Sequence, residues 1–199
     1  MAKVAWKGGT LLAPVPPALV TCSDGTQDNV LTVAWTGITC THPPMTYISL
    51  RPSRYSYEII EKSGEFVINM TTTAICRQVD FCGVKSGREL DKLKACGLHV
   101  AAARGVSAPL LEESPLSLSC VVKQKIPLGT HDMFLAEIVS VAADEKYIDS
   151  KGKLNLQQSG LAAYAHGEYF ALGRKVGSFG YSVKKKKPHP KPQKSKNVR

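Results

Sequence analysis

The sequence predicts a mainly β protein, a small closed antiparallel barrel with helical excursions. Short stretches rich in Val, Ile, Phe and Thr recur along the chain and are separated by turns rich in Gly, Pro and Asp. One helical pattern follows the third stretch, and a longer polar helical region follows the fourth. The chain has 199 residues and is 43% hydrophobic, which is enough apolar material for one substantial core.

The first half of the chain is expected to hold four strands and one helix. Three prolines interrupt residues 11–17 and cannot donate to a sheet, so pairing is expected only at 18–22. The turn-rich loops "SDGTQDN" and "THPP" come before strands predicted at 30–39 and 45–51. A helix capped at Ser53 and ended by Gly64 is predicted next, followed by the strand "EFVINMT".

The second half is expected to begin with an excursion from the barrel. Residues 72–97 predict two short helices interrupted by "GVKSGRELDKLKACG". Strands are predicted at 117–129 and 131–149, joined as a hairpin at Gly129-Thr130. Residues 160–183 are a short apolar segment followed by a glycine-punctuated arm.

The formal net charge of +10 is concentrated at the C-terminus. Residues 184–199 hold seven Lys, one Arg and no acid, which leaves 18 basic and 16 acidic groups in the body, a net +2. A folded nucleic-acid reader carries its charge as a patch on the domain, so specific nucleic-acid binding is not expected. We expect a 1–183 domain and a mobile tail, which either solubilises the chain or docks on a partner.

Cysteine usage and hydropathy favour a cytoplasmic protein. The six cysteines are scattered without a CxxC pair, which predicts free thiols and no metal cluster. The chain contains no apolar run of about 18 residues that would span a membrane, and no signal peptide is recognised at its N-terminus.

The predicted strand "NVLTVAWTGITC" has more hydrogen-bonding groups than a core strand needs. Asn29, Thr32 and Thr36 supply donors and acceptors, and Ala34 leaves room beside them, an arrangement that suits a planar heterocycle. The alternative is that these residues serve only the local backbone structure, because Thr is a good strand former and Asn29 suits a turn.

The next polar stretch, "SLRPSRYS" at 49–56, predicts an anion pocket. Two arginines and serine hydroxyls stand at a helix N-terminus, where free amides and the helix dipole favour a phosphate. Exposed arginines at a helix start are also common without any ligand, so this alternative stays open here.

Five motifs then occur in a characteristic order. These are "NVLTVAWTG", "ISLRPSRYSYEIIEKSGEFVINM", "DFCGVKSGRELDKL", "HDMFLAEIVSV" and "GEYFALGRKVGSFGYSV". In this order the chain resembles the flavin reductase-like, FMN-binding split-barrel family, and especially its flavoredoxin-type members. The resemblance covers roughly residues 10–183 and excludes the lysine-rich tail.

The resemblance implies a set of FMN-binding residues. Those expected along the isoalloxazine ring are Asn29, Thr32, Ala34, Trp35 and Thr36. Those expected at the ribityl chain and phosphate are Ser49, Leu50, Arg51, Ser53 and Arg54. Those expected to close over the flavin are Cys82, Gly83, Ser86, Gly87 and Lys92. Of these, Lys92 is the preferred phosphate or flavin partner, because its flexible ammonium can follow a phosphate.

The resemblance also implies an activity in which the flavin supplies the redox chemistry and no protein nucleophile is required. Electrons are expected from NAD(P)H or a redox protein and pass to a free flavin or another acceptor. Because no GxGxxG follows a strand, a nicotinamide is expected to stack directly over the flavin. A homodimer embraced by the late arm is implied as well. The alternative function is a non-catalytic flavin- or ligand-binding module tethered through its tail.

No residue is assigned as a catalytic group with certainty. His166 either contacts a nicotinamide or substrate flavin, or is an ordinary surface or packing histidine. Cys82 is either a redox-sensitive thiol near the ring or a small buried side chain. His131 is expected to satisfy buried hydrogen bonds at the start of its strand.

Overall fold

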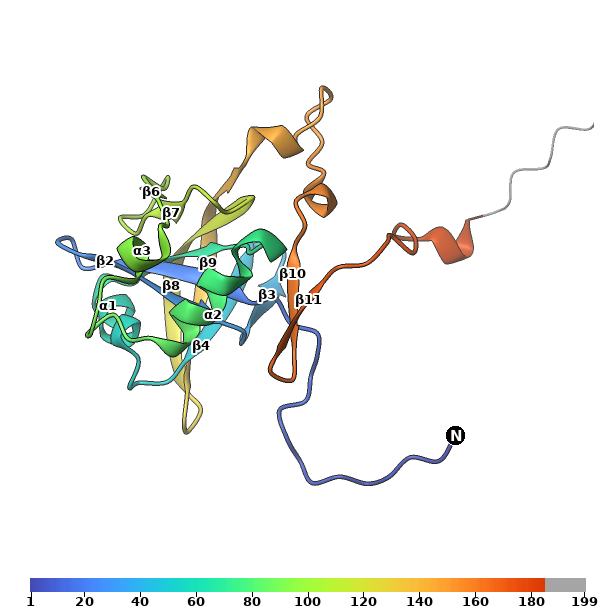
Figure 1. Cartoon of the computed structure of the whole chain (residues 1–199), viewed down its shortest axis with the longest axis horizontal. Helices are drawn as coiled ribbons and strands as arrows, with labels where there is room; N and C mark the ends of the chain where they lie inside the picture. The colour runs from blue at the N-terminus through green and yellow to red at the C-terminus, as the bar shows by residue number, and fades with distance from the viewer. Residues whose placement is uncertain (185–199) are drawn as a thin grey trace, which may run out of the picture.

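A computed structural model describes residues 1–184 of the chain. Figure 1 shows a compact body from which two extended segments project, the N-terminal arm (residues 1–14) and the C-terminal arm (residues 172–184). Apart from Lys184, the lysine-rich tail of the sequence lies outside the described residues.

The body is built on a seven-stranded antiparallel sheet with the strand order β2-β1-β5-β8-β9-β4-β3. Its strands are β1 (Ala18–Ser23), β2 (Asp28–Val33), β3 (Thr36–Cys40), β4 (Met45–Leu50), β5 (Glu65–Asn69), β8 (Leu116–Pro127) and β9 (Asp132–Ala143). The mainly β prediction is confirmed.

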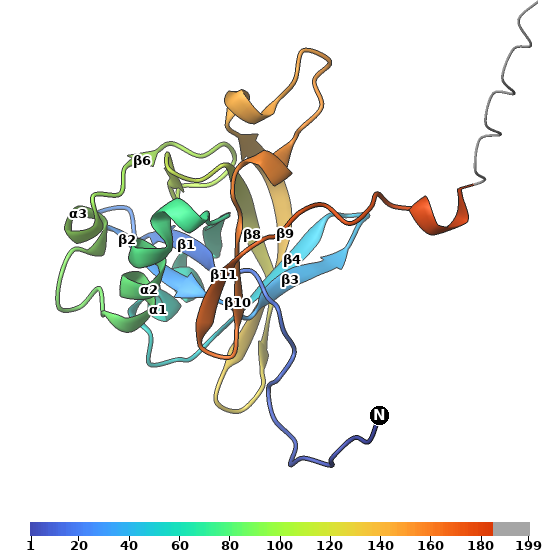
Figure 2. The same cartoon turned by 45° about the vertical axis from the view of Figure 1, so that its right-hand side comes forward.

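The single strand predicted at 30–39 is wrong, because the chain changes edges in its middle. β2 and β3 follow each other in sequence but occupy opposite edges of the sheet. Ala34 and Trp35 join them, and the Trp35 carbonyl accepts a hydrogen bond of 2.9 Å from the Ser49 amide. The two edges of the sheet therefore come together at this corner, which requires a strongly curved sheet. Figure 2 shows β1 and β2 on one side of the body, β3 and β4 on the other, and β8 and β9 between them.

The predicted hairpin of the two longest strands is confirmed. β8 and β9 pair along 12 residues each, and Gly129 turns between them with a φ of 98°. Two register shifts, at Ser119/Cys120 and Val122/Gln124, interrupt their pairing. Such bulges increase local twist and help a long hairpin follow a curved sheet.

One helix contributes to the barrel core. In α1 (Tyr55–Ser63), Tyr57, Ile59 and Ile60 are buried in the same apolar cluster as Phe66 and Phe134. The predicted end at Gly64 is confirmed, with a φ of 70° and its amide donating to the Ile60 carbonyl at 2.9 Å. The predicted Ser53 cap is wrong, since Arg54 occupies the N-cap position and no side chain caps this end.

The two short helices predicted in 72–97 are also confirmed. They are α2 (Cys76–Val84), which follows η1 (Thr73–Ile75), and α3 (Lys92–Cys96). They enclose a second apolar cluster with Leu19 of β1 and Val30 of β2. β1 is consequently buried on both faces, which explains why "ALVTCS" lacks a polar face.

Smaller elements complete the body. The strands β6 (Val100–Ala101) and β7 (Leu110–Leu111) pair with each other, as do β10 (Ala162–Ala165) and β11 (Glu168–Ala171). The short 3-10 helices are η2 (Glu145–Tyr147), η3 (Leu156–Gln158) and η4 (Tyr181–Val183). Within residues 1–184 no helix combines the length and apolarity needed to cross a bilayer.

Candidate functional site

A cleft with three adjoining chambers opens beside β2. All three chambers are lined by Thr32, Arg51 and Arg54. We call them the basic chamber, the corner chamber and the outer chamber, with volumes of about 220, 130 and 470 Å³. The cleft thus brings together β2, the segment between β4 and α1, and the loop between α2 and α3.

The basic chamber carries positive charge only. Arg51, Arg54, Lys85 and Lys92 line it, and no carboxylate does so within residues 1–184. Neither arginine forms an ion pair with any described residue. The uncapped first turn of α1 also lines it through Tyr55 and Ser56. A helix N-terminus and unpaired guanidinium groups together favour a phosphate-like anion.

Lys92 provides a buried ammonium group in this wall. Only 4% of the residue is exposed, and its Nζ donates to the Cys82 carbonyl at 3.2 Å. Burial lowers the pKa of Lys92, with the nearby Arg54 charge acting in the same direction. A bound anion would offset that cost, which makes Lys92 a stronger candidate than an exposed lysine.

The floor of the basic chamber is tightly packed. Asn29 Nδ2 donates to Ser56 Oγ at 2.6 Å, which joins β2 to α1. A Cβ at Gly87 would lie 2.3 Å from Asn29 Oδ1, so only glycine fits there. Gly83 approaches Thr32 closely, and the Thr32 hydroxyl donates to the Val79 carbonyl. The remaining residues predicted for this part, Ser53, Cys82 and Ser86, also line the basic chamber.

The corner chamber lies where the sheet edges meet. It is lined by Ala34 and Trp35, which were expected along the ring, and by Ser49 and Leu50, which were expected at the ribityl chain and phosphate. Thr36 does not line any of the three chambers. Thr36 is the first residue of β3 and lies beyond the corner, where its hydroxyl donates to the Tyr47 carbonyl at 2.6 Å.

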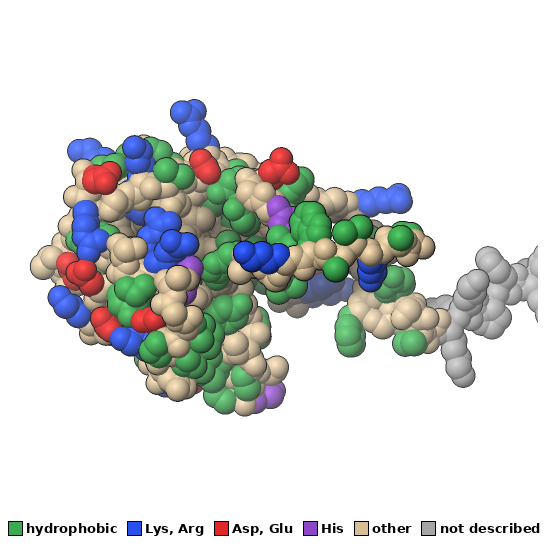
Figure 3. Space-filling view, turned by 90° about the horizontal axis from the view of Figure 1, so that it is seen from below, with side chains coloured by type: hydrophobic (Ala, Val, Ile, Leu, Met, Phe, Trp, Pro, Cys, Tyr) green, Lys and Arg blue, Asp and Glu red, His purple; other side chains and the backbone are tan. Residues whose placement is uncertain are grey.

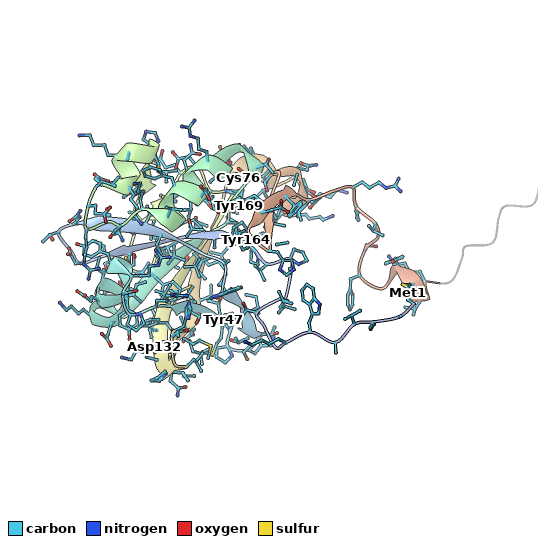
Figure 4. All side chains as sticks on the ribbon, turned by 60° about the horizontal axis from the view of Figure 1, so that its bottom comes forward. Met1, Tyr47, Cys76, Asp132, Tyr164 and Tyr169 are labelled. Atoms are coloured by element: carbon cyan, nitrogen blue, oxygen red, sulfur yellow. The ribbon has the colours of Figure 1, made fainter. Side chains whose placement is uncertain are left out.

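The outer chamber contains residues that the sequence prediction missed. Tyr164 and Tyr169 line it from the β10–β11 hairpin, with ring centroids 5.4 Å apart, and Figure 4 labels both. Tyr169 Oη donates to Asp80 Oδ1 at 3.4 Å, and burial raises the pKa of Tyr169 to about 12. Tyr169 belongs to the quoted "GEYFALG" motif, which is the signal that could have nominated it.

The structure places His131 in the cleft and His166 outside it. His131 was expected to satisfy buried hydrogen bonds, but it lines the corner and outer chambers, and the hydrogen bond that its ring forms within residues 1–184 is with the Thr130 hydroxyl, at 2.9 Å. Desolvation lowers the pKa of His131, and the charges of Arg51 and Arg54 add to this shift. His166 lies exposed at the hairpin tip with a φ of 50° and lines none of the chambers, whereas its neighbour Gly167 lines the outer one.

Figure 3 shows Lys and Arg side chains together with a few Asp and Glu side chains on this face of the body, and both hydrophobic and basic side chains along the projecting arms. No group of three His, Cys, Asp or Glu side chains in residues 1–184 is arranged to hold a metal ion.

Comparisons with known proteins agree with this geometry. Residues 11–173 match the model of the flavin reductase like domain. The solved structure of flavoredoxin from Desulfovibrio vulgaris (Miyazaki F) is 30% identical, with a TM-score of 0.85 over 92% of this chain and 100% of that one. Flavoredoxin from Methanosarcina acetivorans, 23% identical, superimposes with a TM-score of 0.83 over the same shares and supports the fold.

A curated relative adds a described activity. The NADH-dependent FMN reductase AsuE2 of Streptomyces nodosus subsp. asukaensis is 26% identical over 128 residues, which are 65% of this chain and 68% of that protein. The fold is the FMN-binding split barrel of these structural neighbours.

Proposed function

This chain belongs to the flavin reductase-like domain family, and on that premise we propose that it is an FMN-binding oxidoreductase. Electrons pass from NAD(P)H or a redox protein, through bound FMN, to a free flavin or another acceptor. The observation that carries the proposal is the basic chamber, which four cations and no carboxylate of residues 1–184 line, and which adjoins the corner chamber through Thr32, Arg51 and Arg54.

The residues present fit the two ends of FMN. Arg51, Arg54 and Lys92 would hold the phosphate together with the first turn of α1. The hydroxyls of Ser53 and Ser86 would lie nearby. Residues that would line the ring and ribityl chain are Asn29, Thr32, Ala34, Trp35, Ser49, Leu50, Cys82 and Gly83.

When bound, FMN supplies the electron-accepting chemistry, and the protein contributes position and electrostatics. The Asn29 and Thr32 side chains are fixed by hydrogen bonds to Ser56 and Val79, so they hold a preformed wall. The positive groups of the basic chamber orient the phosphate and thereby place the ring toward the corner chamber.

The outer chamber is the proposed place of the second reactant. It adjoins the corner chamber through Ala34, Trp35 and His131, and it is also lined by Tyr164 and Tyr169. Aromatic walls suit a flat ring such as nicotinamide or a second flavin. The relative AsuE2 is an NADH-dependent FMN reductase, which supports a nicotinamide donor.

We also propose a homodimer held by the two arms. Trp6 is 81% exposed and Phe179 fully exposed, an unfavourable state for large apolar side chains unless a second copy covers them. Light scattering of the full chain is expected to give twice the monomer mass, and the double variant Trp6→Asp/Phe179→Asp is expected to give monomers. The variant Lys3→Ser on the same arm serves as control. A monomeric wild type would remove this proposal.

An anaerobic absorbance experiment tests the function. The chain is mixed with FMN, desalted, and its spectrum is recorded before and after NADH or NADPH is added. An enzyme is expected to retain yellow FMN and bleach it quickly with one nicotinamide. A carrier bleaches slowly until a partner reductase is added. A colourless protein that binds anionic polymers with steep salt dependence would instead favour the tethered ligand-binding module.

A further inference from the structure

Two cysteine side chains meet behind the wall of the basic chamber. Cys82 lies in the last turn of α2, Cys96 ends α3, and their Sγ atoms are 3.9 Å apart. All six cysteines of the chain are free thiols, and no other pair within residues 1–184 makes such a contact. Both side chains belong to the apolar cluster between the helices and the sheet.

We propose that Cys82 and Cys96 form a thiol modification site, converted reversibly to an intramolecular disulfide by hydrogen peroxide. A disulfide needs an S–S distance of about 2.05 Å, so the sulfur atoms must approach each other by roughly 2 Å. α3 (Lys92–Cys96) is a helix of only five residues, followed by Gly97, and the disulfide would require a shift of this short element.

The unequal exposure of the two thiols sets the order of the reaction. Cys96 is partly exposed and is the sulfur that an oxidant reaches first, whereas Cys82 is 1% exposed. Burial raises the pKa of the Cys82 thiol to about 12, with the neighbouring Cys96 adding to the shift and the Lys92 charge opposing it. Burial keeps Cys82 from the oxidant, so Cys82 acts second, as the resolving sulfur. Its attack needs the thiolate, which the nearby Lys92 charge favours.

With hydrogen peroxide the chemistry balances in two steps. The Cys96 sulfur attacks one peroxide oxygen, the O–O bond breaks, and a sulfenic acid and one water form. The Cys82 sulfur then attacks the Cys96 sulfur, the S–O bond breaks, and a second water leaves with the remaining thiol proton. The two thiols lose two hydrogen atoms, and one peroxide is reduced to two waters.

The disulfide would join two helices whose connecting loop forms part of the cleft wall. The Cys82 carbonyl accepts the hydrogen bond of Lys92 Nζ, and Lys92 is the first residue of α3. Ser86 and Gly87, on the loop between the two helices, line the basic chamber. A disulfide would therefore close a covalent ring around this wall. The proposal does not depend on FMN binding, because the thiols belong to the chain and the assay supplies the oxidant.

Mass spectrometry of the reduced, flavin-free full chain tests the proposal. After hydrogen peroxide treatment, the intact mass is expected to fall by two hydrogen atoms, and dithiothreitol is expected to restore it. Trypsin should release residues 78–85 linked to residues 95–104, the peptides that contain Cys82 and Cys96. Peroxide that leaves the mass unchanged, or links other peptides, would overturn the proposal.

Serine variants show whether both sulfurs are needed. Cys82→Ser and Cys96→Ser are each expected to abolish the linked peptide, and Cys82→Ser should accumulate a Cys96 sulfenic acid that dimedone traps. Cys40→Ser, which removes an exposed thiol elsewhere, should leave the linkage intact. A loss of two hydrogen atoms in both Cys82→Ser and Cys96→Ser would contradict the assigned pair.

Discussion

Replacing Lys92 by methionine is expected to weaken FMN binding by about 10- to 100-fold and to leave riboflavin binding nearly unchanged. A hydrogen bond to a charged group contributes about 1.5–3 kcal/mol, which corresponds to this loss. Riboflavin lacks the phosphate and does not engage the buried ammonium. Titrations that follow flavin fluorescence with both ligands measure the difference. Arg51→Ala is expected to show the same selectivity for FMN.

Lys94→Met is the matched control, because Lys94 lies exposed on the same short helix and does not line the cleft. Chemical denaturation shows whether Lys92→Met still folds. Burial lowers the pKa of Lys92, so the folded state disfavours the charged form relative to the unfolded chain. Removing the charge is therefore expected to raise the free energy of unfolding at neutral pH. Equal losses for FMN and riboflavin would remove Lys92 from the phosphate role.

The substitution Gly87→Ala is expected to impair both folding and flavin binding. Its new methyl group would lie 2.3 Å from Asn29 Oδ1 and 2.8 Å from Tyr55 Cδ1. Either the loop or Asn29 must move, and the Asn29–Ser56 hydrogen bond that joins β2 to α1 is at risk. Overpacking of this kind costs about 1–3 kcal/mol, and we expect at least a roughly tenfold weaker affinity for FMN.

Gly173→Ala controls for the general effect of adding a methyl group, since a Cβ at Gly173 meets no atom within 4 Å. Denaturant melts and FMN titrations of the two variants should differ clearly. If Gly87→Ala matched Gly173→Ala in stability and affinity, the close contact between the loop and β2 would not exist in solution.

Local signals were sufficient for much of the fold. The Gly64 helix end, the β8–β9 hairpin and the two short helices each depend on residues close together in sequence, and the structure contains them. The segment proposed to bind the phosphate could also be predicted from neighbouring residues, since Arg51 and Arg54 lie within four residues of the start of α1 and line the same chamber as its first turn.

The corner at Ala34–Trp35 depends on closure of the whole sheet. The apolar pattern runs from β2 into β3 without a turn residue, so it predicts one strand. Only the strand order places β2 and β3 at opposite edges. This also removes Thr36 from the cleft, because its hydroxyl pairs with the Tyr47 carbonyl inside the β3–β4 ladder.

The position of His131 in the cleft also depends on residues far apart in sequence. It precedes Asp132, which pairs with Leu50 in the register of β4 and β9. This register places the histidine next to the segment that begins at Arg51, although 80 residues of sequence separate them. No pattern around "GTHDMF" indicates that neighbour.

A crystal structure of the full chain grown with FMN would show where the cofactor binds. The FMN phosphate is expected within about 3 Å of side-chain nitrogen atoms of Arg51, Arg54 or Lys92, with the ring against the Ala34–Trp35 corner. A phosphate bound outside the basic chamber, or a cleft filled by the chain's own side chains in the presence of excess FMN, would contradict this expectation.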